Sequence, residues 1–360
     1  MKLTAAIKLL PTPEQAELLR RTLEAANAAC DVISQTAWET KTFRQFDLHE
    51  LSYTHIRAAF GLSAQLAVRC IAKVSDSYKL DKQTQRTFKP LGALAYDNRI
   101  LRYTLATSTV SIWTLQGRQT IPFVCGERQR ELLQHQKGES DLVFGNGEWF
   151  LFATCDIEEA EPIETRDALG LDLGIVNIAT DSDGESFSGD QIEKKRQWYL
   201  NRRTQLQKVG TKSAKRHLKK LSGRQQRFQK DTNHGISKRI VAKAEHTKRA
   251  IAIEDLKGIR ERVRVKGPQQ RARHSNWAFG QLRSFLAYKA QRMGVPVVLV
   301  DPRNTSRTCR VCGHCEKANR KSQALFCCVS CGHSAPADLN AAQNIKWAAV
   351  NQPLVSAPPE

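Results

Sequence analysis

The chain has 360 residues, with 56 Lys and Arg against 36 Asp and Glu, which gives a formal charge of +20 and a pI near 9.7. This basic excess predicts a polyanionic partner, with nucleic acid as the leading interpretation and an anionic membrane surface as the alternative. No long apolar span and no signal-peptide pattern follow Met1, so we expect a soluble, cytoplasmic protein.

The first 85 residues predict a short strand followed by a small helical bundle. Residues 1–10 favour the strand, which Pro11 ends. Thr12, Pro13 and Gln15 form a capping-box signature for the start of a helix. Apolar residues then recur at helical spacing at Leu19, Leu23, Ala26, Cys30, Ile33 and Ala37. Two further helical patterns cover residues 48–60 and 63–78.

Between Phe88 and Ile157 the apolar period changes to that of strands. The strand-like runs are 101–105, 109–115, 120–123, 142–144 and 149–154, with turn sequences at 116–117 and 145–147. They favour a small antiparallel barrel, a fold that often binds oligonucleotides. The alternative is a structural barrel in which Trp113 and Trp149 belong to the core.

An acidic segment, 158–164, contains a proline and lacks apolar periodicity, so we interpret it as a linker. After it, residues 168–181 predict a buried strand, a turn at Gly174 and a second strand. Asp172 stands in this run among Leu169, Leu171, Leu173 and Ile175. A buried carboxylate is costly unless a cation or hydrogen-bond donors offset it, so Asp172 is a candidate metal ligand. The alternative is an aspartate that caps a turn at a strand end.

The stretch from Lys194 to Lys230 contains no Asp or Glu and predicts a basic helical hairpin, broken near Gly210 and again near Gly223. A run of Lys and Arg usually forms a helix surface that faces solvent. Without nearby acids, however, the positive charges repel one another unless an anion binds to them. The predicted nucleic-acid contacts are Lys194, Lys195, Arg196, Arg202, Arg203, Lys212, Lys215, Arg216, Lys219 and Lys220. A further helix is expected over residues 236–248.

Two more carboxylates stand at the ends of predicted elements. A strand at 251–254 ends in Glu254 and Asp255, of which regular strand geometry can direct only one to a shared site. A basic loop at 260–273, a helix at 276–293 and a strand at 295–300 continue the α/β alternation. Asp338 opens the last helix, where capping alone is an alternative explanation. The three acids suit a two-metal phosphodiester hydrolase, because hard divalent cations require oxygen ligands.

Six of the ten cysteines lie between Cys309 and Cys331. The sequence Cys-x-x-Cys-Gly-His occurs twice there, with fifteen residues between the two cysteine pairs. Two such turns supply four tetrahedral ligands, so the prediction is a closed, structural zinc site of Cys309, Cys312, Cys328 and Cys331. Cys315 and Cys327 fall outside the repeated frame and are the less favoured ligands.

These motifs resemble the TnpB proteins of insertion sequences, relatives of the compact type V CRISPR nucleases. The similarity rests, in family order, on Gly170–Gly174 with Asn177, Ile253–Leu256, Trp277–Leu282, Thr305–Gly313, Phe326–Gly332 and Asp338–Ile345. The N-terminal half is similar more loosely, through Pro11–Gln15, Asn27 and the strand pair around Gly117.

The resemblance implies a multidomain α+β and α/β fold. A helical recognition lobe, residues 11–85, would be inserted into a wedge-like, oligonucleotide-binding β-barrel formed by residues 1–10 and 86–160. An RNase H-like (RuvC) nuclease domain would follow, interrupted by a zinc ribbon and ended by a flexible tail. The expected bounds are 165–305 and 334–350 for the nuclease domain, 190–230 for its basic hairpin, 306–333 for the ribbon and 351–360 for the tail.

The resemblance also implies an RNA-guided DNA endonuclease that cuts target DNA beside a short flanking motif. Asp172, Glu254 and Asp338 would be the catalytic acids and would hold two Mg²⁺, with one structural Zn²⁺ in the ribbon. Guide RNA and target DNA are the expected partners, a monomer is favoured over a dimer, and the protein would associate with the nucleoid when bound. The alternatives are a guided DNA-binding repressor that does not cut, as in relatives that have lost an acid, and a DNA transposase. One departure from the family is Pro336-Ala337, where Asp-Arg often precedes the last acid.

Overall fold

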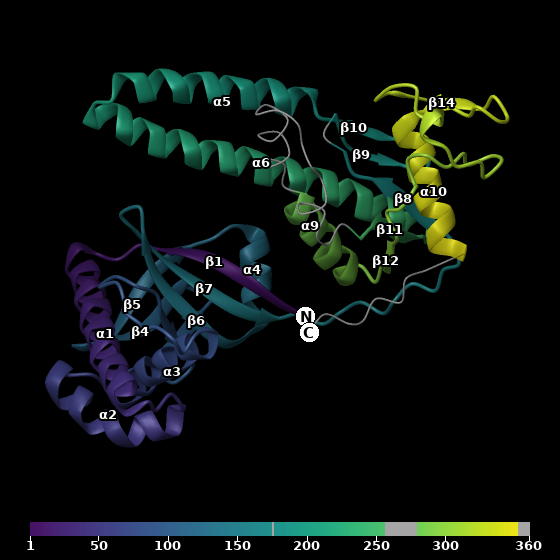
Figure 1. Ribbon diagram of the computed structural model, residues 1–360. Helices are drawn as coiled ribbons and strands as arrows, with labels where there is room; N and C mark the ends of the chain where they lie inside the picture. The colour runs from purple at the N-terminus through teal and green to yellow at the C-terminus, as the bar shows by residue number, and fades with distance from the viewer. Residues whose placement is uncertain (175, 256–278, 352–360) are drawn as a thin grey trace. The chain divides into compact units, whose positions relative to one another are not determined.

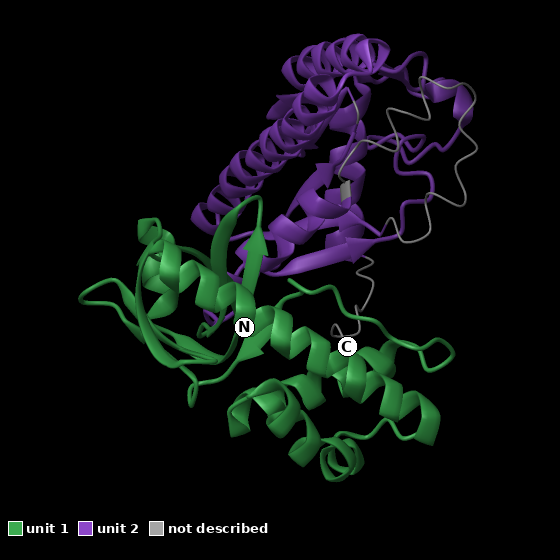
Figure 2. Cartoon of the chain, turned by 90° about the vertical axis from the view of Figure 1, so that its left-hand side faces the viewer, with its two compact units in different colours: residues 1–158 green, residues 159–360 purple. Residues whose placement is uncertain are grey.

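The computed structural model describes residues 1–174, 176–255 and 279–351, which form two compact units, residues 1–158 and the chain from 159 onward (Figures 1 and 2). The predicted basic loop at 260–273, the start of the 276–293 helix and of the motif Trp277–Leu282, and the tail after Asn351 lie outside the described residues. Within the described ranges, no helix combines the length and apolar character needed to cross a bilayer.

The helices of unit 1 confirm the local signals at its start. Thr12 caps the first long helix, where its hydroxyl accepts from the Gln15 N–H at 3.3 Å and the Gln15 side chain accepts from the Thr12 N–H at 3.1 Å. All six residues of the predicted apolar face are fully buried. The helices are α1 (Pro13–Thr40), α2 (Gln45–Phe60), α3 (Ala64–Leu80) and the short α4 (Glu127–Leu133).

The strands of unit 1 form one seven-stranded antiparallel sheet in the order β2-β6-β7-β1-β5-β4-β3. Tyr103 on β3 donates a hydrogen bond to Ser140 on β6 at 3.0 Å, so the two ends of the sheet approach each other in a nearly closed barrel. Trp149 is buried and Trp113 is half-buried against the same core, so the structural alternative holds fully for Trp149 and in part for Trp113. The strands are β1 (Lys2–Leu9), β2 (Leu94–Tyr96), β3 (Leu101–Thr104), β4 (Thr109–Thr114), β5 (Gly117–Val124), β6 (Gln136–Gly145) and β7 (Glu148–Asp156).

Unit 2 is built on a five-stranded sheet in the order β10-β9-β8-β11-β12. The neighbours β8, β11 and β12 run parallel, whereas β9 pairs antiparallel with both β8 and β10. Helices cover both faces, which explains why these strands read as almost continuous apolar runs. The strands are β8 (Ala168–Asp172), β9 (Asn177–Asp181), β10 (Ser186–Ser188), β11 (Ala250–Glu254) and β12 (Val297–Val300).

The two faces of this sheet receive different helices. Leu169 and Leu171 of β8 pack with Ile251 and Ile253 of β11 against α6 (Lys212–His246) and α9 (Phe279–Arg292). The alternate residues, among them Ala168 and the alanines of β11, face α10 (Ala337–Asn351). Small side chains on this second face let α10 lie close to the strands (Figure 1).

Gly170 is the point of closest approach between strand and helix. A Cβ atom at this position would lie 2.1 Å from the Ala342 carbonyl oxygen and 2.5 Å from the Lys346 amide nitrogen. Only glycine fits there, because both neighbours are backbone atoms that cannot rotate away. Gly170 therefore fixes the position of α10 on the sheet.

The basic hairpin consists of α5 (Asp190–Val209) and α6, joined at Gly210, which has the left-handed φ of 67°. The predicted break near Gly223 is wrong, and so is the separate helix at 236–248, because α6 runs through both as one helix. An interior glycine costs only about 1 kcal/mol relative to alanine, and good helix formers flank it. Thr211 supplies the cap for α6, accepting from the Ala214 N–H at 3.2 Å.

Candidate active site

Two of the predicted acids lie at the same edge of the unit 2 sheet. Ile253 pairs with Leu171 in the parallel β8–β11 register, so Asp172 and Glu254 follow side by side at the carboxyl ends of these strands. Along their strands, Asp172 and Glu254 alternate with the Leu and Ile residues that pack against α6 and α9. Their side chains therefore lie on the opposite face of the sheet, which α10 covers. Ligand sites of open α/β sheets lie at such strand ends.

Asp338 reaches this edge from α10. It stands one helical turn before Ala342, whose carbonyl contacts Gly170, and Asp172 follows Gly170 by two residues on the same face of β8. Asn177 donates a hydrogen bond to the Asp338 carboxylate at 2.9 Å. The Asp338 side chain is 17 % exposed, with Arg320 3.6 Å away. These contacts give Asp338 interactions beyond those of a helix cap.

Charge and burial act together on the acids. The pKa of Asp172 is raised from 3.8 to about 7, chiefly by burial and then by the charges of Glu254 and Asp338, while Arg320 opposes the shift. Burial also raises the pKa of Glu254, against the lowering effect of the hydrogen bond donated by Thr305. A buried carboxylate whose ionisation is opposed by two neighbouring acids makes a site that a cation would stabilise.

The surroundings of Asp172 support this interpretation over a turn cap. Across residues 1–174, 176–255 and 279–351, no group donates a hydrogen bond to its carboxylate. The neighbouring Asp255 points elsewhere and pairs with Arg283 of α9 at 3.2 Å. Glu254 is therefore the strand-end acid that faces Asp172, and the set offers the oxygen atoms that a hard divalent cation requires.

The four cysteines of the repeated motif form a second cluster. Their sulfur atoms all lie within 4.8 Å of one another, with 3.7 Å between Cys309 and Cys331 and 3.6 Å between Cys312 and Cys328. A tetrahedral zinc with bonds of about 2.3 Å separates its sulfur ligands by about 3.8 Å, so the arrangement fits this ion. Cys315 is exposed and is not a member of this four-cysteine cluster.

The two knuckles repeat one backbone geometry. Gly313 donates to the Cys309 carbonyl at 2.9 Å, and Gly332 donates to the Cys328 carbonyl at 3.0 Å, with left-handed φ values of 72° and 74° for the glycines. In the segment predicted to be a zinc ribbon, the buried core consists of Cys309, Phe326, Cys328 and Ala337. Ala337, where the sequence departs from the TnpB pattern, therefore fills this core directly before Asp338.

The basic hairpin presents most of the predicted contacts to solvent. Arg196 pairs with Glu193 at 2.6 Å, and Arg203 donates to Gln225 of α6 at 2.8 Å, so these two have partners within the hairpin. Trp198 is 54 % exposed with Lys195 above its ring. The exposed members are Lys194, Lys195, Arg202, Lys212, Lys215, Arg216, Lys219 and Lys220.

No role was predicted from the sequence for three residues that contact or flank the sites, although Thr305 opens one of the motifs of the resemblance. Thr305 donates to Glu254, and Arg320 reaches Asp338 from the segment between the cysteine pairs. Neither has a spacing signal, because both contacts are made across the fold. Trp198 could have been noticed as a large aromatic residue within the basic run.

Two family models match the part of the chain that contains the acids and the cysteine cluster. The family model of a probable transposase, OrfB_IS605, matches residues 152–259, and the Cas12f1-like TNB domain matches residues 279–345. The CRISPR-associated endodeoxyribonuclease Cas12f1 of Sulfoacidibacillus thermotolerans is 28 % identical over 59 % of this chain and 53 % of its own length. The TnpB-like protein MJ0751 of Methanocaldococcus jannaschii is 39 % identical over 32 % of this chain and 40 % of its own.

A Cas12f1 chain, solved in a complex with sgRNA and target DNA, shares the fold with a TM-score of 0.64 at 15 % identity, over 93 % of this chain and 83 % of that one. The chain spans about half the length of the curated relatives it matches. The resemblance to the TnpB family and its Cas12f1 relatives is confirmed by these matches.

Proposed function

From its similarity to TnpB-like proteins and Cas12f1 nucleases, we propose that the chain is an RNA-guided DNA endonuclease that hydrolyses phosphodiester bonds. One observation carries the proposal: Asp172, Glu254 and Asp338 come from three distant segments and meet at one edge of the unit 2 sheet. An isolated strand-end aspartate would not require this convergence.

The three acids would hold two Mg²⁺ ions, which supply Lewis-acid stabilisation of the attacking and leaving oxygens when bound. Two other residues of this chain hold two of these acids in position. Asn177 orients Asp338, and Thr305 orients Glu254, each through a hydrogen bond to one carboxylate oxygen. Metal binding would use the oxygens of Asp172, the second oxygen of Glu254 and the Asp338 oxygen that lies 3.6 Å from Arg320.

The other parts of the chain have proposed roles that follow from their chemistry. The four cysteines would bind one structural Zn²⁺, and the exposed cations of the hairpin would contact nucleic-acid phosphates. Pairing between guide RNA and the target strand would supply sequence specificity, while the protein holds the backbone and reads a short flanking motif. The domain bounds given above for the barrel, the helical lobe, the nuclease domain and the ribbon are part of this proposal.

The function is tested with protein purified together with its cellular RNA. Sequencing that RNA defines a guide, and a plasmid that carries the matching target beside randomised flanking sequence then serves as substrate. We expect Mg²⁺-dependent cuts in plasmids with one flanking motif. Target binding without any cut would identify a repressor, and joined DNA strands without bound RNA would identify a transposase.

The cysteine cluster gives a prediction about stability. Replacing Cys309 with serine should release zinc and lower the melting temperature by several degrees, because structural zinc binding contributes directly to folding. Cleavage should fall as well, since the ribbon core ends at Ala337, next to Asp338. Metal analysis and calorimetry measure both effects. Cys315→Ser is the matched control, and equal behaviour of the two variants would contradict the assignment.

The raised pKa of Asp172 gives a prediction about pH. In metal-free protein the Asp172 carboxyl group keeps its proton up to about pH 7 in the folded state, whereas in the unfolded state it loses the proton above about pH 4. The free energy of unfolding should therefore fall as pH rises from 4 to 7. Mg²⁺ must displace this proton, so its affinity should rise about tenfold per pH unit below 7 and level off above it. Calorimetric Mg²⁺ titrations at pH 6 and 8 measure this, and equal affinities would refute it.

A further inference from the structure

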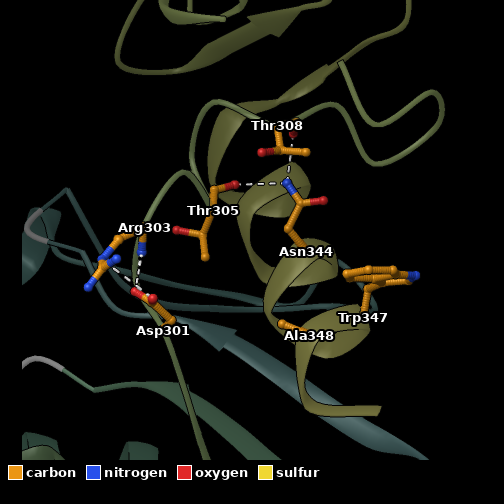
Figure 3. Close-up of a pocket in the computed structure, with 7 residues that line it drawn as sticks. All are labelled: Asp301, Arg303, Thr305, Thr308, Asn344, Trp347 and Ala348. Atoms are coloured by element: carbon orange, nitrogen blue, oxygen red, sulfur yellow. Dashed lines mark hydrogen bonds and ion pairs between the residues drawn. The ribbon is translucent and has the colours of Figure 1, made fainter. Parts of the chain in front are cut away.

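A pocket of about 210 Å³ lies between α10 and the loop that follows β12 (Figure 3). Asp301, Arg303 and Thr305 line it from the loop, and Asn344 and Trp347 line it from the helix. Sites for drug-sized ligands measure about 300–1,000 Å³, so this smaller space suits one part of a larger ligand, such as a single base of a nucleic-acid strand, better than a whole free cofactor.

The pocket adjoins the three acids through a shared residue. Thr305 lines the pocket and donates its hydroxyl hydrogen bond to the Glu254 carboxylate. Val300 pairs with Glu254 in the β11–β12 register, and Asp301 follows it directly. A group in the pocket would therefore lie next to the acid site.

Hydrogen bonds among the lining residues hold the walls of the pocket in place. Asn344 donates to the carbonyl oxygens of Thr305 at 2.8 Å and Thr308 at 2.7 Å, which ties the loop to α10. Asp301 accepts from the Arg303 N–H at 2.9 Å. Figure 3 shows the Trp347 ring on one side of this frame and the Arg303 side chain on the other.

The two outer walls have complementary chemistry. Trp347 is 58 % exposed and so presents part of a large, flat apolar ring to solvent. The Arg303 side chain is 85 % exposed and stands only 3.5 Å from Asp301, a surface pair that leaves its other donors available. A flat apolar surface and a cation at opposite ends match a nucleobase and the phosphate beside it.

We propose that this pocket receives one nucleotide of the DNA strand that is being cut, with its base stacked on Trp347 and a neighbouring phosphate at Arg303. The inference rests on the proposed nuclease function and deepens it. Trp347 is then a substrate-positioning residue: it holds the strand beside the acid site and takes no part in metal binding.

The test uses the full chain with its co-purified RNA, and target DNA that carries 2-aminopurine at successive positions around the cut. Binding is measured in Ca²⁺, where we expect fluorescence quenching at one position in the wild type and none in Trp347→Ala. In Mg²⁺ this variant should lose roughly 5- to 100-fold in single-turnover cleavage, the factor that one stacked base contributes. Trp347→Phe should restore most of the rate.

Val350→Ala is the matched control, because Val350 is an exposed apolar residue of α10 that does not line the pocket. It should cleave and quench like the wild type. If wild-type protein cuts and Trp347→Ala cuts equally fast with the same quenching, the pocket assignment fails while the nuclease function stands. If wild-type protein does not cut at all, the proposed function itself fails. Equal losses in Val350→Ala and Trp347→Ala would also overturn the assignment, because they would indicate a general effect on α10.

Discussion

Asp172→Asn is expected to abolish target cleavage and to stabilise the metal-free protein at the same time. In the proposed site the substitution removes a metal ligand, and the bound metal would contribute several kcal/mol of charge stabilisation, so cleavage should fall by at least about 10³-fold, at tenfold for each 1.36 kcal/mol. It also removes a carboxylate whose ionisation is opposed by burial and by Glu254 and Asp338. Loss of that cost should raise the melting temperature by about 2–4 °C for each kcal/mol gained.

The pH dependence of the stability gained by Asp172→Asn shows whether the gain comes from removing the charge of Asp172. At pH 8 the wild-type carboxylate is ionised, and the variant should be the more stable protein. At pH 5 the wild-type group is protonated, because its pKa is about 7, and the difference should largely vanish. Asp255→Asn is the control, since Asp255 pairs with Arg283 of α9 and should remain compatible with cleavage. A stable Asp172→Asn protein that still cuts in Mg²⁺ would remove Asp172 from the site.

Gly170→Ala is expected to have the second large effect. The added Cβ would stand 2.1 Å from the Ala342 carbonyl oxygen, so strand and helix must separate. Overpacking of this kind costs about 1–3 kcal/mol or more. Because Asp338 lies one turn from Ala342, the shift of α10 should also move Asp338 away from Asp172, and cleavage should fall together with stability.

A second glycine substitution provides the comparison. Gly235 lies inside α6, where an added Cβ would meet no atom within 4 Å. Gly235→Ala should therefore stabilise the helix, by up to about 1 kcal/mol, and leave cleavage unchanged. Melting curves and cleavage rates of the two variants test this contrast. Wild-type stability in Gly170→Ala would show that α10 does not lie where the structure places it.

Features that depend on a few neighbouring residues could be predicted from the sequence. The capping box at Thr12 forms as its spacing indicates, because its hydrogen bonds join residues three apart. The same holds for the paired cysteine knuckles, whose glycines adopt the predicted tight turns. Strand alternation also identified Glu254 as one of two acids at a strand end, although only the register shows that it stands beside Asp172.

Features that depend on tertiary packing could not be predicted in this way. The glycine at 223 indicated a helix break, yet α6 continues, since one glycine costs less than the rest of the helix gains. The two short elements β2 and α4 contain too few residues for a periodic pattern. Arg320 and Thr305 contact the acids across the fold, and no spacing in the chain relates them to Asp338 or Glu254.

The most direct test of the acid site replaces Mg²⁺ with Fe²⁺ in the full protein–RNA complex and adds ascorbate and peroxide, so that bound iron cuts the nearby polypeptide. Mass spectrometry then maps the cuts. One site built from Asp172, Glu254 and Asp338 predicts cuts beside all three residues, which excess Mg²⁺ suppresses and Asp172→Asn weakens at every position. Cuts beside only one of the acids, or an unchanged pattern in Asp172→Asn, would contradict a shared metal site.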